Sequence, residues 1–253
     1  MSGAAPAPDI SEDAILGGTV RLRQPRDGYR VAIDPVLLAA AVPASAGDIV
    51  LDVGCGVGAA SLCLARRVPS CRVVAFDRQR ELVRLASDNI LLNELGGRVT
   101  AMAGDLLKPP PRLEPGAFSH VMANPPFLES GKASPSPSPG KAEASIEGEA
   151  DLSAWVRFAL AMASGRGTMT FIHRTDRLPQ LLRELSGRAG DIVVFPLWAG
   201  AGKPAKRILV QARKGNAAPL RLLPGLVLHE ADGRNTDAAE AVLRHGAAID
   251  LVT

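Results

Sequence analysis

The chain has 253 residues, of which 47% are apolar, and a formal net charge of +3. Its mean hydropathy is +0.11 and its pI is near 9.0. This composition excludes an extended disordered chain, and no apolar run approaches the roughly 18 residues of a membrane span. The Ala- and Pro-rich start carries neither a basic segment nor an apolar secretory segment, so we expect a cytoplasmic protein.

Cysteine and charge patterns narrow the chemistry further. The cysteines, Cys55, Cys63 and Cys71, are odd in number and lack CxxC spacing, which predicts buried thiols and favours neither disulfides nor a metal site. The basic residues gather in two clusters, which suit either a polyanionic partner or ordinary solvated faces. The clusters are Arg21, Arg23, Arg26 and Arg30, and Lys203, Lys206, Arg207, Arg213 and Lys214.

The first part of the chain is predicted to enter a folded domain after a short tail. Residues 1–13 are rich in Ala and Pro and have no periodic apolar face, which predicts a disordered tail followed by a single domain over residues 14–253. A short strand is expected within residues 15–23. Asp34 followed by Pro35 predicts a helix reaching about residue 42, with Asp34 as its cap.

The next part alternates strands and helices. A continuous apolar strand over residues 48–53 runs into a glycine loop and a helix over 59–68. Further strands are expected at 72–76, 98–103 and 117–123, with a helix at 79–93. This order predicts an α/β fold with a Rossmann-like, doubly wound and mostly parallel sheet, because successive parallel strands need right-handed crossovers.

The last part is separated by a low-complexity segment. The Ser-Pro run of residues 134–139 predicts a mobile loop over residues 129–149. Helices are expected at 152–163 and 176–186, and a strand at 167–172. Strands at 191–197 and 206–212, joined by a basic turn, predict an antiparallel hairpin at one edge of the sheet. An extended segment at 220–229 and a helix at 236–244 complete the chain.

Asn124, Pro125, Pro126 and Phe127 follow a short apolar run. A helix cannot continue through two prolines, and a proline holds the preceding residue extended, so a strand is predicted to end at residues 123–124. In open α/β sheets, ligands bind at the carboxyl edge of the strands. The motif would place an amide, rigid carbonyls and an aromatic ring at that edge, which suits a planar substrate carrying an NH2 group.

Gly54, Gly56 and Gly58 lie between a predicted strand and a helix, where glycines permit a tight turn and close approach of a ligand. With Ala59, the spacing also satisfies the dinucleotide-binding fingerprint, and Asp77 lies where its ribose-binding acid is expected. A nicotinamide or flavin enzyme is therefore one interpretation of this loop.

Acids at three neighbouring strand ends favour S-adenosylmethionine instead. Asp52 precedes the glycine loop, where a carboxylate repels a pyrophosphate and attracts the methionine ammonium. Asp77 is expected to accept hydrogen bonds from the ribose hydroxyls, and Asp105 from the adenine amino group. Together the acids match the amine, ribose and adenine of this cofactor.

Several stretches resemble one family. Residues 50–58 resemble the first motif of Rossmann-like methyltransferases, and residues 124–127 resemble the fourth motif of those that act on planar amino groups. The bacterial tRNA adenine N6-methyltransferase group, which modifies a valine tRNA beside its anticodon, is similar over about residues 15–245. The Ser-Pro run departs from its pattern. The further matching stretches are residues 24–30, 33–39, 171–178 and 228–230.

The resemblance implies methyl transfer from S-adenosylmethionine to the N6 amine of an adenine in a tRNA anticodon loop. It also suggests Arg30 as a basic residue near the methionine carboxylate. The predicted catalytic residues are Asn124, Pro125, Pro126 and Phe127. The predicted cofactor residues are Arg30, Asp52, Gly54, Cys55, Gly56, Asp77, Asp105 and Asn124.

The chemistry predicted for the motif needs no strong base. The Asn124 side-chain oxygen and the Pro125 carbonyl would accept both amine hydrogens, which aims the nitrogen lone pair at the methyl group. Phe127 would stack on the base, a contact worth roughly 1 to 3 kcal/mol. His173 and His229 lack partners at ligand spacing, so we expect them to pack or to contact the RNA backbone.

Other functions fit parts of the pattern. The same chemistry suits N5-methylation of a release-factor glutamine or N2-methylation of an rRNA guanine. The glutamine enzymes resemble this chain less, because only about 47 residues precede the first strand of the domain, too few for their helical recognition domain. From a different class, a non-catalytic RNA-binding module would keep the fold without binding the cofactor.

Overall fold

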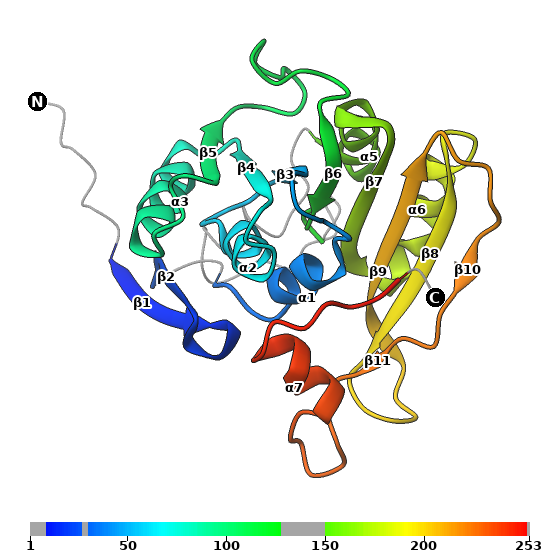
Figure 1. Ribbon diagram of the computed structural model, residues 1–253. Coiled ribbons are helices and arrows are strands. Elements are labelled where there is room, and N and C mark those ends of the chain that lie inside the picture. Colours follow the sequence, from blue (N-terminus) through cyan, green and yellow to red (C-terminus); the bar gives the residue numbers. More distant parts are fainter. Residues whose placement is uncertain (1–8, 27–29, 128–149, 252–253) are drawn as a thin grey trace, which may run out of the picture.

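The computed structural model describes residues 9–26, 30–127 and 150–251. At its centre lies a nine-stranded sheet with the order β10-β8-β9-β7-β6-β3-β4-β5, in which β11 also pairs with β8 (Figure 1). Within this sheet, the first five strands in chain order run parallel to one another. They are β3 (Ile49–Val53), β4 (Arg72–Asp77), β5 (Val99–Ala103), β6 (Phe118–Ala123) and β7 (Ala163–Arg174).

An antiparallel hairpin extends this sheet on the β7 side. It consists of β8 (Ala189–Trp198) and β9 (Ala205–Lys214), and β9 pairs with β7. Two short strands, β10 (Arg221–Leu222) and β11 (Leu226–Val227), add to β8 in parallel. The predicted fold, a Rossmann-like and mostly parallel sheet with an antiparallel hairpin near one edge, is confirmed.

Helices cover both faces of the sheet, which explains its continuous apolar strands. Along β3, for example, Val50 packs into the core on one face and Leu51 into the core on the other. The first core is covered by α1 (Asp34–Ala41), α2 (Ala59–Arg67) and α3 (Arg80–Leu92), with α7 (Asp237–Leu243) beside them. The second is covered by α5 (Leu152–Met162) and α6 (Leu178–Leu185).

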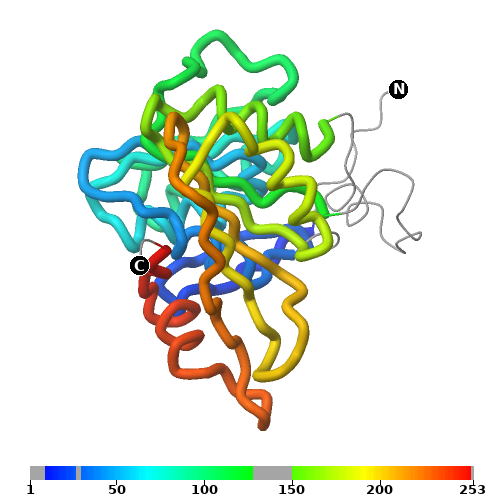
Figure 2. The backbone as a smooth tube through the Cα atoms, turned by 90° about the vertical axis from the view of Figure 1, so that its right-hand side faces the viewer, coloured from blue at the N-terminus to red at the C-terminus, as the bar shows by residue number. Residues whose placement is uncertain are grey.

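The C-terminal segment lies along the outer side of the hairpin. In Figure 2 its orange and red part runs past β8 and β9 to α7 at the lower end of the molecule. Within the described residues, no helix is long and apolar enough to cross a membrane. The predicted mobile loop of residues 129–149 lies outside the described part of the chain.

The chain begins with a hairpin, and here the predicted tail boundary was wrong. Residues 10–13 belong to β1 (Ile10–Ile15), which pairs antiparallel with β2 (Val20–Pro25). Their composition is polar, but pairing with β2 supplies the backbone hydrogen bonds that composition alone does not reveal. Residues 1–8 of the predicted tail lie outside the described residues.

Buried asparagines of α3 hold this hairpin on the domain. Asn89 accepts a hydrogen bond from the Arg23 amide at 2.7 Å and donates to the Arg23 carbonyl at 2.9 Å. It also donates to the Val57 carbonyl, next to the glycine loop, at 3.0 Å. Asn93 forms the same pair of bonds with the backbone of Arg21, at 2.9 and 2.7 Å. The side chains of α3 thus supply hydrogen-bond partners for the backbone of β2.

Replacing Asn89 with Ala should destabilise the protein by about 2 to 4 kcal/mol, because it leaves buried backbone groups of Arg23 and Val57 without partners. Urea unfolding followed by circular dichroism would measure the free energy of unfolding. Asp88→Ala, at an exposed position of the same helix, is the control and should change stability little. Equal stabilities of the two variants would contradict this role of Asn89.

Candidate active site at the carboxyl edge of the sheet

The predicted glycine loop and the predicted Asn-Pro-Pro-Phe motif meet at one edge of the sheet. In the parallel pair β3–β6, Val53 is the register partner of Ala123, so Gly54 and Asn124 leave the sheet as neighbours. Adjacent strands lie about 4.8 Å apart. On the other side of β3, Val53 is paired with Phe76, and the next residue of β4 is Asp77. The structure therefore assembles one candidate site from these strand ends.

The glycine loop is tied to the end of β4. The amides of Gly54 and Cys55 donate to the Phe76 carbonyl at 2.7 and 3.1 Å, and the Gly56 amide donates to Asp77 at 2.9 Å. Gly54 and Gly56 have φ angles of +71° and +55°, which side chains rarely tolerate. Cys55 is buried, and burial raises the pKa of its thiol well above the usual range, so it is a neutral packing group.

Asp52 lies beneath the loop and already has a partner in the protein. Its carboxylate accepts a 2.6 Å hydrogen bond from the Ser61 hydroxyl of α2, and the residue is 2% exposed. Burial is the main reason that the pKa of Asp52 rises to about 7, and the negative charge of Asp77 adds to it. A ligand cation placed near this carboxylate would favour its ionised form.

The other two predicted acids end the neighbouring strands. Asp77 is buried, and it accepts the Gln79 amide at 2.8 Å besides that of Gly56. Burial raises its pKa, and these backbone bonds oppose the rise. Asp105 follows β5 and is partly exposed, and it accepts the Leu107 amide at 2.9 Å. Since β3, β4 and β5 are adjacent, the acids do lie along one edge, as the sequence predicts.

Asn124 presents an acceptor that the fold leaves unused. Its Oδ1 atom is fully buried and has no hydrogen-bond partner among the described residues. Pro125, directly after it, is buried as well. A buried carbonyl oxygen without a donor costs free energy, so the site is suited to a ligand that brings an N–H group.

Phe127 is fixed by residues from distant parts of the chain. The Arg207 guanidinium carbon lies 4.3 Å from the centre of the ring, and the same guanidinium donates to Asp34 at 3.1 Å. His173 meets the ring edge-on, with 5.4 Å between the ring centres. The arginine covers one face of Phe127, so in this arrangement the predicted stacking on a base would use the opposite face.

One prediction about this group of residues changes, and another is confirmed. Asp34 is the first residue of α1 rather than its cap, and its buried carboxylate pairs with Arg207 instead of a helix amide. His173 is fully buried, and burial together with the positive charges of Arg177 and Arg207 lowers its pKa to about 3. The expectation that His173 packs is confirmed, and its ring is neutral.

Arg30 follows the N-terminal hairpin and contacts its first strand, and its predicted place near the methionine carboxylate stays a prediction. Its guanidinium donates to the Ser11 hydroxyl at 2.9 Å and to Asp13 at 2.8 Å. No described contact links it to the glycine loop. In this structure, the positive charge of Arg30 is paired with the carboxylate of Asp13.

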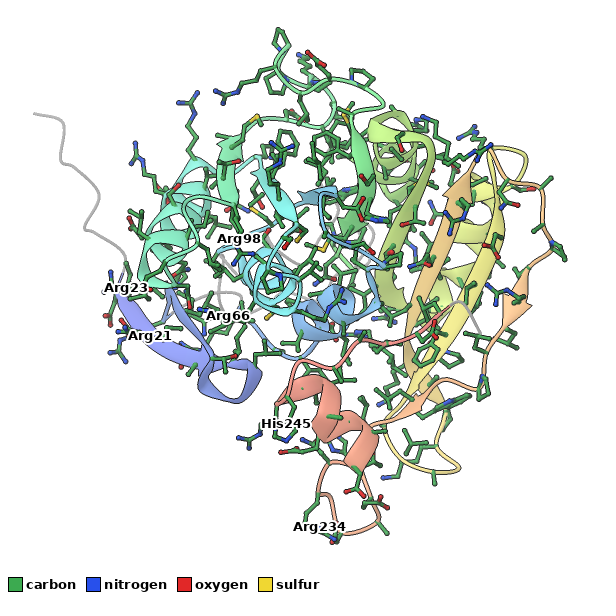
Figure 3. The ribbon with its side chains drawn as sticks, viewed as in Figure 1. Arg21, Arg23, Arg66, Arg98, Arg234 and His245 are labelled. Carbon is green, nitrogen blue, oxygen red and sulfur yellow. The ribbon has the colours of Figure 1, made fainter. Side chains whose placement is uncertain are left out.

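The first basic cluster is neutralised in the same way. Arg21 and Arg23 both pair with Glu12, and Arg26 pairs with Asp9. Figure 3 shows Arg21 and Arg23 on the hairpin, with Arg66 and Arg98 in the neighbouring part of the domain. Arg98 donates to the carbonyls of Ala65 and Val68 and so caps α2, at the opposite edge of the sheet from Asn124. Arg98 thus contributes to the stability of α2, whereas the arginines of the hairpin form exposed ion pairs.

The second basic cluster is divided. Arg207 belongs to the Phe127 contact, and Lys214 donates to the Ala163 carbonyl at 2.7 Å. Lys203 and Lys206 are exposed in and beside the turn that joins β8 to β9. Since Arg207 is the register partner of Arg174 at the end of β7, this turn lies at the same edge as Asn124.

Two general features complete the description of the site. An open hollow of about 600 Å³ is lined by Arg66, Arg67, Arg244 and other residues of the opposite edge, so it is separate from the strand-end site. Among the residues that the structure describes, no group of three or more His, Cys, Asp or Glu side chains could hold a metal ion. The cysteines are buried free thiols, as predicted.

Comparison with known proteins shows similarity to methyltransferases. Residues 31–136, which contain the glycine loop and Asn124, match the family model "Methyltransferase small domain". A predicted O-methyltransferase from Agrobacterium tumefaciens has the same fold, with a TM-score of 0.71 at 24% identity over 85% of this chain and 98% of that one. Residues 31–136 are therefore similar to the methyltransferase small domain family, and the chain has the Rossmann-like fold that the sequence predicts.

Within this class, the similar curated relatives share one name, tRNA1(Val) (adenine(37)-N6)-methyltransferase. The relative from Porphyromonas gingivalis is 29% identical over 81% of this chain and 83% of its own length. The relative from the Flavobacteriaceae bacterium strain 3519-10 is 32% identical over 43% of this chain, and the match spans about half of that protein, 46%. The predicted resemblance to this group is confirmed.

The raised pKa of Asp52 predicts a pH dependence of stability. The unfolded carboxyl has a pKa of about 3.9, so the folded protein holds the proton more tightly. This contribution is fully present below about pH 4 and is lost as the pH rises to about 7, by about 1.4 kcal/mol per pH unit. Asp52→Asn cannot titrate, so the stability of the wild type should fall relative to the variant between about pH 5 and pH 7. Urea unfolding at several pH values tests this, and parallel profiles would contradict it.

The contact of Arg207 with Phe127 should appear as a coupling free energy. Unfolding of Arg207→Ala, Phe127→Ala and the double variant should give about 1 kcal/mol of coupling, because the guanidinium is partly desolvated over the ring. Lys206→Ala is the matched control, since alternate residues of a strand point to opposite faces. The effects of Lys206→Ala and Phe127→Ala should simply add. If the effects in the Arg207 cycle are additive as well, the result would contradict a stabilising interaction between Arg207 and Phe127.

Proposed function

We propose that this protein transfers a methyl group from S-adenosylmethionine to the exocyclic N6 amine of an adenine in tRNA. The observation that carries the proposal is the buried, unpartnered Oδ1 atom of Asn124 at the end of β6, directly beside the glycine loop. An acceptor held at that place fits an N–H group of an acceptor amine, and the loop on the next strand fits a methyl donor.

The motif residues act on the amine itself. An adenine amine is a weak nucleophile because its lone pair is delocalised into the ring. Asn124 Oδ1 and the Pro125 carbonyl accept its two hydrogens, draw the nitrogen toward tetrahedral geometry and stabilise the positive charge that develops in transfer. When bound, the cofactor would supply an electrophilic methyl group on a sulfonium: the S–CH3 bond breaks as the N–CH3 bond forms, S-adenosylhomocysteine leaves as the thioether, and the methylated amine loses one proton to water. The free face of Phe127 stacks on the base, while Arg207 holds the ring from behind.

Each strand end would bind a different part of the methyl donor. Asp52 would face the methionine ammonium from beneath the loop, and its proton would be lost as the cation arrives. Asp77 has further lone pairs for the ribose hydroxyls beyond those used by Gly56 and Gln79. Asp105 would accept from the adenine amino group of the donor. Arg30 has no part in this assignment.

A tRNA loop is the macromolecular substrate that we propose. The names of the relatives give adenine 37 of a valine tRNA as their acceptor, a position beside the anticodon. Unstacking a base costs least in a single-stranded loop. Exposed Lys203 and Lys206 lie at the same edge as Asn124 and supply positive charge for phosphates around the loop.

Product analysis tests the activity directly. The protein would be incubated with isotopically labelled S-adenosylmethionine and an unmodified valine tRNA transcript, and the digested nucleosides would be separated by mass spectrometry. We expect labelled N6-methyladenosine that disappears when the loop adenine is replaced by guanine. Label in N2-methylguanosine or in a release-factor glutamine instead would identify one of the alternative acceptors, and label in neither RNA nor protein would contradict the proposal.

Replacing Asn124 tests whether this residue acts on the acceptor amine or binds the methyl donor. Asn124→Ala should lower kcat by at least about 100-fold, because an acceptor that acts in the transition state is lost. Binding of S-adenosylhomocysteine, measured by calorimetry, should change by less than about tenfold, or 1.4 kcal/mol. Asn124→Asp keeps the acceptor oxygen and should retain more activity than the alanine variant. A large loss of cofactor affinity in Asn124→Ala would make Asn124 chiefly a cofactor ligand.

A further inference from the structure

The glycine loop, residues 54–58, is held from two sides. Its first half is tied to the end of β4, where the Gly56 amide donates to Asp77 at 2.9 Å. Its second half is tied to α3, because Asn89 Nδ2 donates to the Val57 carbonyl at 3.0 Å. The N–H of the same peptide group, which belongs to Gly58, donates back into the loop at 2.9 Å. Asn89 thus fixes the peptide at which the loop turns into α2.

The helix α3 also limits the space around this turn. Gly58 has a φ angle of +88°, and a Cβ atom added to it would lie 3.4 Å from Ala86 Cβ of α3. The helix α2 begins directly after Gly58, and its first turn carries Ser61, whose hydroxyl donates to Asp52. A shift of the turn relative to α3 would therefore move the loop and the hydroxyl partner of Asp52 together.

The amide of Asn89 is itself held in one orientation by the N-terminal hairpin. Its Oδ1 atom accepts the Arg23 amide at 2.7 Å, and Nδ2 donates to the Arg23 carbonyl at 2.9 Å. With the bond to Val57, both hydrogens of the side-chain amide are used. Asn89 is 0% exposed. The strand β2 therefore supports the glycine loop through this one buried side chain.

Asn93 lies one helical turn further along α3 and lacks the contact with the loop. It forms the same pair of hydrogen bonds with the backbone of Arg21, at 2.9 and 2.7 Å, and it is also buried. Its other donated bond, of 2.7 Å, goes to the Asn89 carbonyl within the helix. The two asparagines thus hold the hairpin alike, and the bond to the loop distinguishes Asn89.

We propose that Asn89 is a positioning residue for the methyl donor, and this inference rests on the proposed function. It acts through the Val57 carbonyl rather than on the donor itself, and it holds the glycine loop in its binding shape before the donor arrives. Without this bond the free loop takes up more conformations, so binding has to order it and the affinity falls. Through Asn89, the N-terminal hairpin becomes a supporting part of the donor site.

Asn89→Ala and Asn93→Ala form a matched pair, since both lose the bonds to β2 and only the first loses the bond to the loop. With S-adenosylhomocysteine as the probe, calorimetry should show an about three- to tenfold weaker affinity for Asn89→Ala. Asn93→Ala should bind as the wild type does. In methyl transfer, the KM for S-adenosylmethionine should rise by a similar factor in Asn89→Ala, with little change in kcat. Equal affinities of the two folded variants would overturn the inference.

A second measurement leaves Asn89 in place. In the isotopically labelled wild type, the NMR signals of the Asn89 side-chain amide should shift when S-adenosylhomocysteine binds, because its acceptor Val57 belongs to the loop. Those of Asn93 should stay unchanged. If Asn89→Ala does not fold, an unmoved Asn89 signal in a protein that binds the probe would overturn the inference and leave the proposed function intact. Failure of the wild type to bind the probe would overturn both.

Discussion

The parallel pairing of β3 with β6 is the constraint on which the candidate site depends. Its register places Val53 opposite Ala123, so the glycine loop and Asn124 leave the sheet side by side although 70 residues separate them in sequence. Helices on both faces make the pairing rigid, because each strand is buried in two cores. A donor held by the loop and an amine held by Asn124 would therefore meet without any large movement of the sheet.

The domain uses its charges unequally. Those of the N-terminal hairpin neutralise one another at the surface, where such pairs contribute little to stability. The pair of Asp34 with Arg207 is different, since it is partly buried and fixes the aromatic ring of the motif. Asp52 remains buried, with the hydroxyl and backbone of Ser61 as its partners. Asp34 thus has a cationic partner that helps to hold the fold, whereas no cationic partner of Asp52 is found among the described residues.

A buried polar atom without a partner lies beside the glycine loop. Asn124 Oδ1, at the carboxyl edge of the sheet, is buried and has no hydrogen-bond partner among the described residues. By contrast, the buried asparagines of α3 are satisfied by the backbone of β2. A polar group that stabilises the fold has its partners within the chain. Lack of a partner does not by itself mark a ligand site, since Arg67 Nε at the opposite edge lacks one among the described residues too. The position of Asn124 beside the glycine loop connects the structure to the proposed methyl transfer.

The sequence by itself determined the order of strands and helices, the strand end at Asn124 and the glycine loop after β3. These follow from local rules: prolines end a strand, glycines permit the turn, and apolar runs mark buried strands. It did not place the tertiary partners. From the sequence, Arg207 was one member of a basic cluster and Asp34 a helix cap. Arg30 was assigned to the cofactor, yet it pairs with Asp13. Only the folded chain brings these side chains to their partners, because contacts between residues far apart in sequence leave no local pattern.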